Sequence, residues 1–389
     1  MHDYMDYCLR CYLRETGWNN RNQYSNLRAP ARAILDFNIP HGLSFHAGRA
    51  PSDWLKSAHS FQPLPRMNGS IGYMYTSKRL FADPQHVMGM TEVAEGFQTA
   101  YSAMAPSDAP GEGSSPSDRK ASLARPVRWT GEPAFFLYGR MFLPSGELEA
   151  MMARRATRHS QYVLTGFSTP DPRDPIQVTM QWWHDRGPWC TEVSYSTDDS
   201  MAGLRGLYNF RWPDLPSKAN HLFSAGEASA DAFADFSAHD HASSSSSDDG
   251  LWSAGAEVYY SAKEKSGGIS TGLRYRATQP FVFEVTNIVN PAMGHTSTAY
   301  TAAVNPQLTC STRFDFNLYS YESDLCIGAE WRNGGEGVVK GRFGFRQGLA
   351  LLFDGRYRNA LFSFGLVVDA HQRTNAFFRS IGLQIQYII

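Results

Sequence analysis

The chain has 389 residues, and its 36 basic residues are nearly balanced by 37 acidic residues, which gives a formal net charge of −1. That balance excludes a protein drawn to nucleic acid by its overall charge. Charged residues make up only 19% of the chain, below the roughly 25% that is usual in soluble domains, whereas aromatic residues reach 13%. This composition is typical of a sheet whose outer face contacts lipid.

The first predicted element is a short helix over residues 4–14. Tyr4, Cys8 and Tyr12 follow one another at helical spacing, Gly17 is a common helix terminator, and the polar stretch 19–28 is interpreted as a connector. Residues 1–10 lack the basic and apolar regions of a signal peptide and the Arg- and Ser-rich character of a transit peptide. We therefore expect a chain that is synthesised in the cytosol and is not secreted.

From Ala31 the pattern changes to alternation. Apolar residues stand at 31, 33, 35, 37 and 39, with Ile34 as the one exception on the polar face, and they predict a first strand that turns at residues 40–42. Similar alternation recurs around residues 71–75, 176–182, 252–258, 269–275, 308–318, 325–331, 362–368 and 381–387. About 18 to 20 such segments are expected, and a tilted strand needs ~9–11 residues to cross a bilayer.

Two architectures compete for this pattern. A soluble sandwich or barrel also alternates, with its apolar face inward, but a soluble barrel of this many strands would have an interior too wide for side chains to fill. A transmembrane barrel with an apolar outer face avoids that problem, and its closure satisfies every backbone group. No run approaches the ~18 apolar residues of a transmembrane helix. We therefore predict an all-β transmembrane barrel of about 19 strands over residues 29–389, preceded by a helix and connector over residues 1–28, with long polar loops near 81–125 and 212–250.

Motifs for catalysis, cofactors or metals are weak in this sequence. Cys8 and Cys11 form a CxxC without a second pair of zinc ligands, and His239 and His241 lie in a Ser/Asp-rich stretch that is interpreted as a solvated loop. No dinucleotide-binding, phosphate-binding or serine-nucleophile motif is present. We expect no enzyme activity, no cofactor and no metal site.

Two charged or terminal segments carry further expectations. The basic cluster at residues 154–158 is interpreted as a solvated turn, with a strand rim near acidic headgroups as the alternative. The C-terminal residues Ser380, Gly382, Ile385 and Tyr387 follow the order polar, glycine, hydrophobic, hydrophobic. That order is similar to the signal by which mitochondrial barrels are recognised for insertion.

Several blocks of the sequence resemble the fungal mitochondrial distribution and morphology protein 10 family. These blocks are Tyr4-Met5-Asp6 with Leu9-Arg10, Leu35-Asp36-Phe37-Asn38-Ile39-Pro40, Asn68-Gly69-Ser70-Ile71-Gly72-Tyr73-Met74-Tyr75, Tyr138-Gly139-Arg140-Met141 with Leu148-Glu149-Ala150-Met151, and Asp315-Phe316-Asn317-Leu318-Tyr319-Ser320 with Glu322-Ser323. The resemblance implies a barrel of the same type as the voltage-dependent anion channel, with 19 strands and the N-terminal helix in or near the pore. It also implies a location in the mitochondrial outer membrane.

The resemblance further implies a non-enzymatic role for a protein that is embedded in the lipid bilayer and has two protein complexes as partners. One is the endoplasmic reticulum–mitochondria encounter structure, a tether that supports phospholipid exchange, and the other is the sorting and assembly machinery for barrels and the import translocase. Tyr73 and Tyr75 would contact the assembly machinery, whereas Phe314 and Phe316 would contact the tether. Phe314 departs from the family, in which a hydroxyl-bearing aromatic residue is expected. A metabolite or protein-conducting channel of the anion-channel class remains the alternative.

Overall fold

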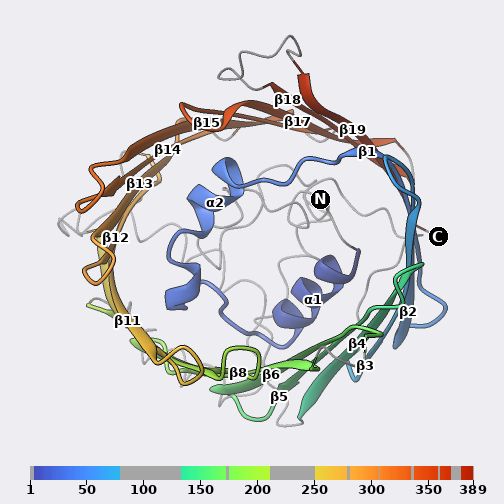
Figure 1. Cartoon of the computed structure of the whole chain (residues 1–389), viewed down its shortest axis with the longest axis horizontal. Coiled ribbons are helices and arrows are strands. Elements are labelled where there is room, and N and C mark those ends of the chain that lie inside the picture. The colour runs from blue at the N-terminus through green and yellow to red at the C-terminus, as the bar shows by residue number, and fades with distance from the viewer. Residues whose placement is uncertain are drawn as a thin grey trace, which may run out of the picture.

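The computed structural model describes residues 4–78, 133–171, 175–210, 250–277, 281–305, 307–333, 337–357, 360–368 and 378–388. The described strands form one 19-stranded sheet in which each strand pairs with its neighbours in the chain. All of these neighbouring pairs are antiparallel, and the sheet closes where β1 (Gly42–Arg49) pairs in parallel with β19 (Phe378–Ile388). The predicted fold class is therefore confirmed: the chain is a closed barrel (Figure 1).

The strands between β1 and β19 are joined in sequence order around the barrel. Their bounds are β2 Leu55–Leu64, β3 Asn68–Thr76, β4 Ala134–Leu143, β5 Leu148–Arg155, β6 Ser160–Ser168, β7 Gln177–Asp185, β8 Trp189–Ser196, β9 Met201–Asn209, β10 Leu251–Ser261, β11 Ser266–Ala277, β12 Phe283–Asn290, β13 His295–Ala303, β14 Leu308–Asn317, β15 Ser323–Asn333, β16 Gly337–Gly344, β17 Gly348–Tyr357 and β18 Ala360–Val368. Within the described part of the chain, no helix is long and apolar enough to cross a membrane.

Alternation along each strand separates a lumenal face from an outer face. On β19, Gln384 and Gln386 are buried toward the lumen, whereas Ile381 and Tyr387 are exposed on the outside. Closure leaves no unpaired sheet edge, which the hydrocarbon region of a membrane requires. The alternation in the sequence therefore predicts correctly which side chains face the lumen and which face outward.

The N-terminal segment lies inside the barrel (Figure 1). It contains helix α1 (Tyr4–Glu15), the short 3₁₀ helix η1 (Tyr24–Asn26) and helix α2 (Ala29–Leu35). The predicted N-terminal helix in the pore is thus confirmed. We call residues 16–41 the lumenal segment, because they follow α1 along the inner wall to the start of β1.

The predicted strand over residues 31–39 is wrong, because residues 29–35 form α2 and the first strand begins at Gly42. Pro30 lies in the first turn of α2, where its missing N–H leaves no hydrogen bond unmade. Ala31, Ile34 and Leu35 share one helical face at positions i, i+3 and i+4, and all are buried. Ile34, which interrupts the alternation, was the residue that indicated a helix.

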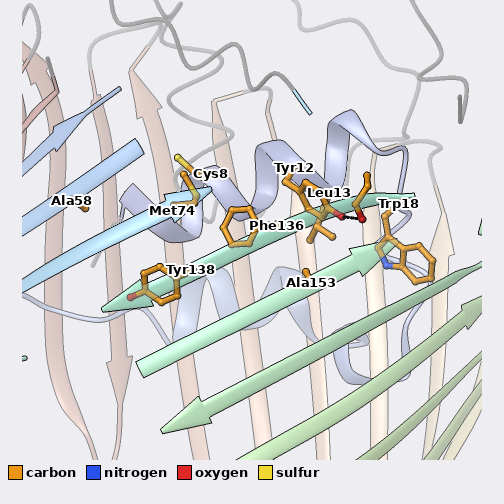
Figure 2. Packing of buried hydrophobic residues seen from close by; sticks show 10 residues of the cluster. Cys8, Tyr12, Leu13, Trp18, Ala58, Met74, Phe136, Tyr138 and Ala153 are labelled. Atoms are coloured by element: carbon orange, nitrogen blue, oxygen red, sulfur yellow. Dashed lines mark hydrogen bonds between the residues drawn. The ribbon is translucent and has the colours of Figure 1, made fainter. Parts of the chain in front are cut away.

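Helix α1 packs against the inner wall formed by β2 to β5 (Figure 2). Cys8, Tyr12 and Leu13 contact a wall cluster that includes Met74 and Phe136. The Tyr12 hydroxyl donates to the Ala134 carbonyl at 2.9 Å, and burial raises the pKa of Tyr12 to about 12, so the hydroxyl remains a donor at neutral pH. The wall is therefore apolar on both faces in this region, and α1 occupies the inner one.

Candidate docking surfaces

The first predicted pair, Tyr73 and Tyr75, lies on the outer face of β3. Their side chains are 55% and 45% exposed, whereas Met74 between them points inward to α1. The Tyr73 ring meets His59 edge-on with centroids 6.2 Å apart, and the Tyr75 ring lies 5.9 Å from Phe135. The two rings are thus held by neighbouring strands and project from the wall as adjacent aromatic groups.

An apolar groove of about 460 Å³ begins at this tyrosine pair and extends over the outer face toward β7. Its floor is a row of small residues in direct register, in which Gly139 on β4 pairs with Ala150 on β5 and Ala150 pairs with Gly166 on β6. A Cβ atom added at Gly139 would meet no atom within 4 Å. Small side chains at this position therefore create a depression in the outer wall and are not required by packing within the barrel.

Larger apolar side chains border the groove. They include Leu55, Tyr73, Tyr75, Leu137, Met152 and Leu164. In membranes, close approach of a partner depends on small interface residues, because lipid tails are as apolar as the protein surface. The groove can therefore accept a protruding apolar segment with the tyrosine pair at its edge. We call this region, defined by Tyr73, Tyr75 and the row from Gly139 to Gly166, the tyrosine face.

The second predicted pair, Phe314 and Phe316, lies on the outer face of β14. Phe314 is 47% exposed, and the two rings are nearly parallel, with centroids 6.4 Å apart and an interplanar angle of 8°. The side chains of Arg313 and Asp315, which alternate with the phenylalanines, point to the lumen. There Arg313 donates to the Asp36 carboxylate at 2.7 Å and to the Asp315 carboxylate at 3.0 Å. The outer pair thus stands on a strand that is held from inside by the lumenal segment.

Two exposed tyrosines continue this surface beyond the end of β14. The Tyr319 hydroxyl donates to the Pro291 carbonyl at 3.0 Å, which fixes its ring over the neighbouring turn. Tyr321 is 78% exposed at the tip of the same hairpin. Tyr319 belongs to the Asp-Phe-Asn-Leu-Tyr-Ser block and Tyr321 follows it directly, but the sequence pattern gave no means of placing them on one surface with the phenylalanines. We call the four residues Phe314, Phe316, Tyr319 and Tyr321 the phenylalanine face.

The tyrosine and phenylalanine faces lie on opposite sides of the barrel, because β3 and β14 are on opposite sides of the ring (Figure 1). Side chains from the two faces therefore do not form one site. A single partner of ordinary size would contact one face or the other, and two partners would not compete for the same area of wall.

The predicted insertion residues lie on β19 at the closing seam. The Ser380 hydroxyl is 2.6 Å from His41 Nδ1, and Ile385 pairs with Phe45 of β1 and Phe362 of β18. Tyr387 is exposed on the outer face, whereas Gly382 is buried against the backbone of Pro40. The structure therefore places these residues on the strand that closes the barrel against β1.

The remaining sequence candidates do not form a chemical site within the described residues. Cys8 and Cys11 both lie on α1, where Cys8 is buried and Cys11 is half-buried. No group of three metal-ligating side chains occurs in the part of the chain that the structure describes. His239 and His241 lie outside the described residues, as do the loop at 81–125 and residues 212–249.

The interpretation of the basic cluster as a solvated turn is wrong for Arg155, the last residue of β5, which is buried at the lumenal face. Its guanidinium donates to the carbonyls of Thr16 and Arg158, and it lies 5.3 Å above the Trp18 ring. Arg155 therefore caps the end of α1, where backbone carbonyls lack helical partners. Only the register of β5 against the lumenal segment reveals this role.

Comparison with known proteins identifies related chains. The family model described as mitochondrial distribution and morphology protein 10 matches residues 1–337. The chain is 31% identical to mitochondrial distribution and morphology protein 10 of Laccaria bicolor over 451 aligned positions, which cover 100% of this chain and 99% of the relative. The proteins of that name from Postia placenta and Phaeosphaeria nodorum are 32% and 31% identical, with coverage of 100% of this chain and 99% and 100% of each relative.

Proposed function

Because the chain belongs to the mitochondrial distribution and morphology protein 10 family and so has a role in mitochondrial distribution and morphology, we propose that it is a non-enzymatic scaffold with two docking faces. The barrel fold and the family support a location in a mitochondrial membrane. The proposal specifies the outer membrane. There the phenylalanine face anchors the endoplasmic reticulum–mitochondria encounter structure, and the tyrosine face binds the sorting and assembly machinery.

The observation that carries this proposal is the position of the two aromatic pairs on opposite sides of one rigid wall. Aromatic side chains are enriched among the residues that dominate binding energy at interfaces. Exposed aromatics also form girdles that contact lipid headgroups, but a girdle does not require the groove beside Tyr73 or the stacked arrangement of Phe314 and Phe316. Two separate faces allow tethering and barrel assembly to use the same protein.

Co-purification from detergent-solubilised mitochondria tests the proposal. Tagged wild-type protein should recover subunits of both partner complexes. Tyr73→Ala/Tyr75→Ala should lose the assembly machinery and keep the tether, and Phe314→Ala/Phe316→Ala should do the reverse. The matched control is Val258→Ala/Tyr260→Ala on β10, which removes another exposed outward pair and should keep both partners.

Two outcomes would contradict the two-face scaffold. One is loss of both partners in either double variant that still folds as a barrel. The other is an equal loss in the β10 control, which would indicate a general requirement for large apolar side chains on the outer face and not two docking sites.

A further inference from the structure

The inner wall is shaped to receive the lumenal segment at several points. Tyr24 and Leu27 lie over Gly255 of β10 and Gly272 of β11, where an added Cβ would stand 2.6 Å from the Tyr24 ring and 2.7 Å from a Leu27 methyl group. Such distances are too short for real contacts. A side chain at Gly272 would displace the segment, and one at Gly255 would meet both the Tyr24 ring and the Gly206 carbonyl oxygen of the neighbouring strand.

A second recess accepts α2 some distance around the wall. A Cβ added at Gly328 on β15 would stand 2.8 Å from Leu35 and 3.0 Å from Ile34. Ile34 and Leu35 are buried in a cluster with Ala299 of β13 and Cys326 of β15. The apolar face of α2 is thus fitted to the wall by close packing, and lifting it would expose these side chains.

Wall cations also hold the carbonyl ends of the lumenal helices. Lys340 Nζ donates to the Ala33 carbonyl at 3.0 Å and Arg342 Nη1 donates to the Leu35 carbonyl at 2.5 Å. Arg155 donates to Thr16 after the end of α1. Backbone carbonyls at a helix C-terminus lack internal donors and carry the negative end of the helix dipole. Both α1 and α2 therefore end on a cation supplied by the barrel.

We propose that the lumenal segment is a fixed lining of the inner wall, anchored separately at η1 and α2, and not a displaceable gate. A gate requires a second state of similar free energy. Leaving the wall would instead uncover Ile34 and Leu35, separate Arg313 from Asp36, and remove the carbonyl partners of Lys340 and Arg342. The barrel then acts through its outer wall and rims, and not by opening a pore through movement of this segment. This inference stands independently of the proposed partners.

Native thiols make the anchoring measurable. Cys190 of β8 is buried with Tyr24 and Leu27 of the η1 region, and Cys326 is buried beneath α2. Two variants, each retaining one of these thiols with the other four cysteines replaced by alanine, would be reconstituted in planar bilayers. A charged, water-soluble thiol reagent would then be applied with and without transmembrane voltage. Heat-unfolded protein gives the reference rate for a free thiol.

We expect both thiols to react slower than the unfolded reference by on the order of a hundredfold or more, because the reagent reaches a thiol beneath a packed segment only after local unfolding. We expect voltage to have no effect on either rate. Adding Ile34→Asp should release α2 and speed the reaction at Cys326 while Cys190 stays protected, in protein that still migrates as a folded barrel before heating. Rapid or voltage-dependent reaction of either thiol in the folded starting protein would overturn the proposal. Release of both thiols together by Ile34→Asp would also overturn it, since separately anchored sites would not detach as one body.

Discussion

Gly382 meets two requirements at one backbone position. It supplies the glycine of the predicted insertion residues, and its lumenal side adjoins the main chain of Pro40, which a Cβ would strike. Gly365 is its direct partner on β18, and a Cβ there would strike the side chains of Ile39 and Pro40. A defect caused by changing Gly382 alone would therefore have two possible physical causes.

Gly365→Ala separates these causes, because Gly365 lies outside the insertion residues. We expect the substitution to destabilise the folded barrel by about 1–3 kcal/mol, the usual cost of forcing atoms into a packed site. The midpoint of heat-induced unfolding in detergent measures the effect. Gly139→Ala, where the new Cβ meets open space, is the control and should leave the midpoint unchanged. An unchanged midpoint for Gly365→Ala would show that Ile39 and Pro40 do not constrain the seam.

The floor of the groove gives a second prediction at a single residue. Gly139→Leu fills the depression beside Tyr73 and leaves both tyrosines in place. If the assembly machinery enters this groove, the variant should lose co-purification with that complex and keep the tether and its thermal midpoint. Gly206→Leu on β9 is a matched control, because a Cβ there also meets no atom within 4 Å. Full recovery of the assembly machinery by Gly139→Leu would exclude the groove as the docking site.

Some residues of the two outer faces could be predicted from the sequence, and others could not. Tyr73, Tyr75, Phe314 and Phe316 were singled out by resemblance to a family, and alternation placed each pair on one face of a strand; their roles in binding remain predictions. The groove and Arg155 were not predicted. The groove depends on which residues stand opposite one another on neighbouring strands, and the role of Arg155 depends on its contacts with Thr16 and Trp18 of the lumenal segment. The pattern of a single strand contains no information about either.

Strands were the most predictable elements of this chain. Residues 177–182 and 308–317 alternate between apolar and polar side chains in the sequence, as expected where one face contacts lipid and the other faces the lumen. The alternation at residues 31–39 predicted a strand that does not form. The alanines are compatible with a strand or a helix, and only the apolar Ile34 distinguishes the helical period from the strand period. The inner face of β3 to β5 also departs from a polar lumen, because α1 covers it with apolar side chains.

The pair formed by Glu330 of β15 and Lys340 of β16 allows a prediction at this scale. The two residues are direct partners in the sheet, their charged groups are 3.5 Å apart, and both side chains are buried. Lys340→Met leaves the Glu330 charge without this cation and removes one of the two cations that cap α2, so we expect the free energy of unfolding to fall by about 3–5 kcal/mol. Thermal unfolding checks this value.

The double variant Glu330→Leu/Lys340→Met serves as the control for the buried charge. It removes both charges, so it should recover much of the loss. If the double variant is as unstable as Lys340→Met, the cost lies in the lost contact with α2 and not in the buried carboxylate.

At the scale of the whole molecule, the wall divides its contacts between two sides. The lumenal side holds the chain's own N-terminal segment through glycine recesses, wall cations and the ion pair between Arg313 and Asp36. The outer side leaves exposed aromatic residues at two places far apart on the ring. The inner contacts involve the same strands that display the aromatics, because Met74 of β3 packs against α1 and Arg313 of β14 pairs with Asp36.

Site-specific photo-crosslinking in mitochondria tests this account most directly. A photoreactive residue would be placed at position 73, at position 314, and at position 258 on β10 as the control. The account predicts crosslinks to the assembly machinery from position 73, crosslinks to the tether from position 314, and crosslinks to neither from position 258. Crosslinks to the same subunit from positions 73 and 314, or to either complex from position 258, would contradict a scaffold with two separate docking faces.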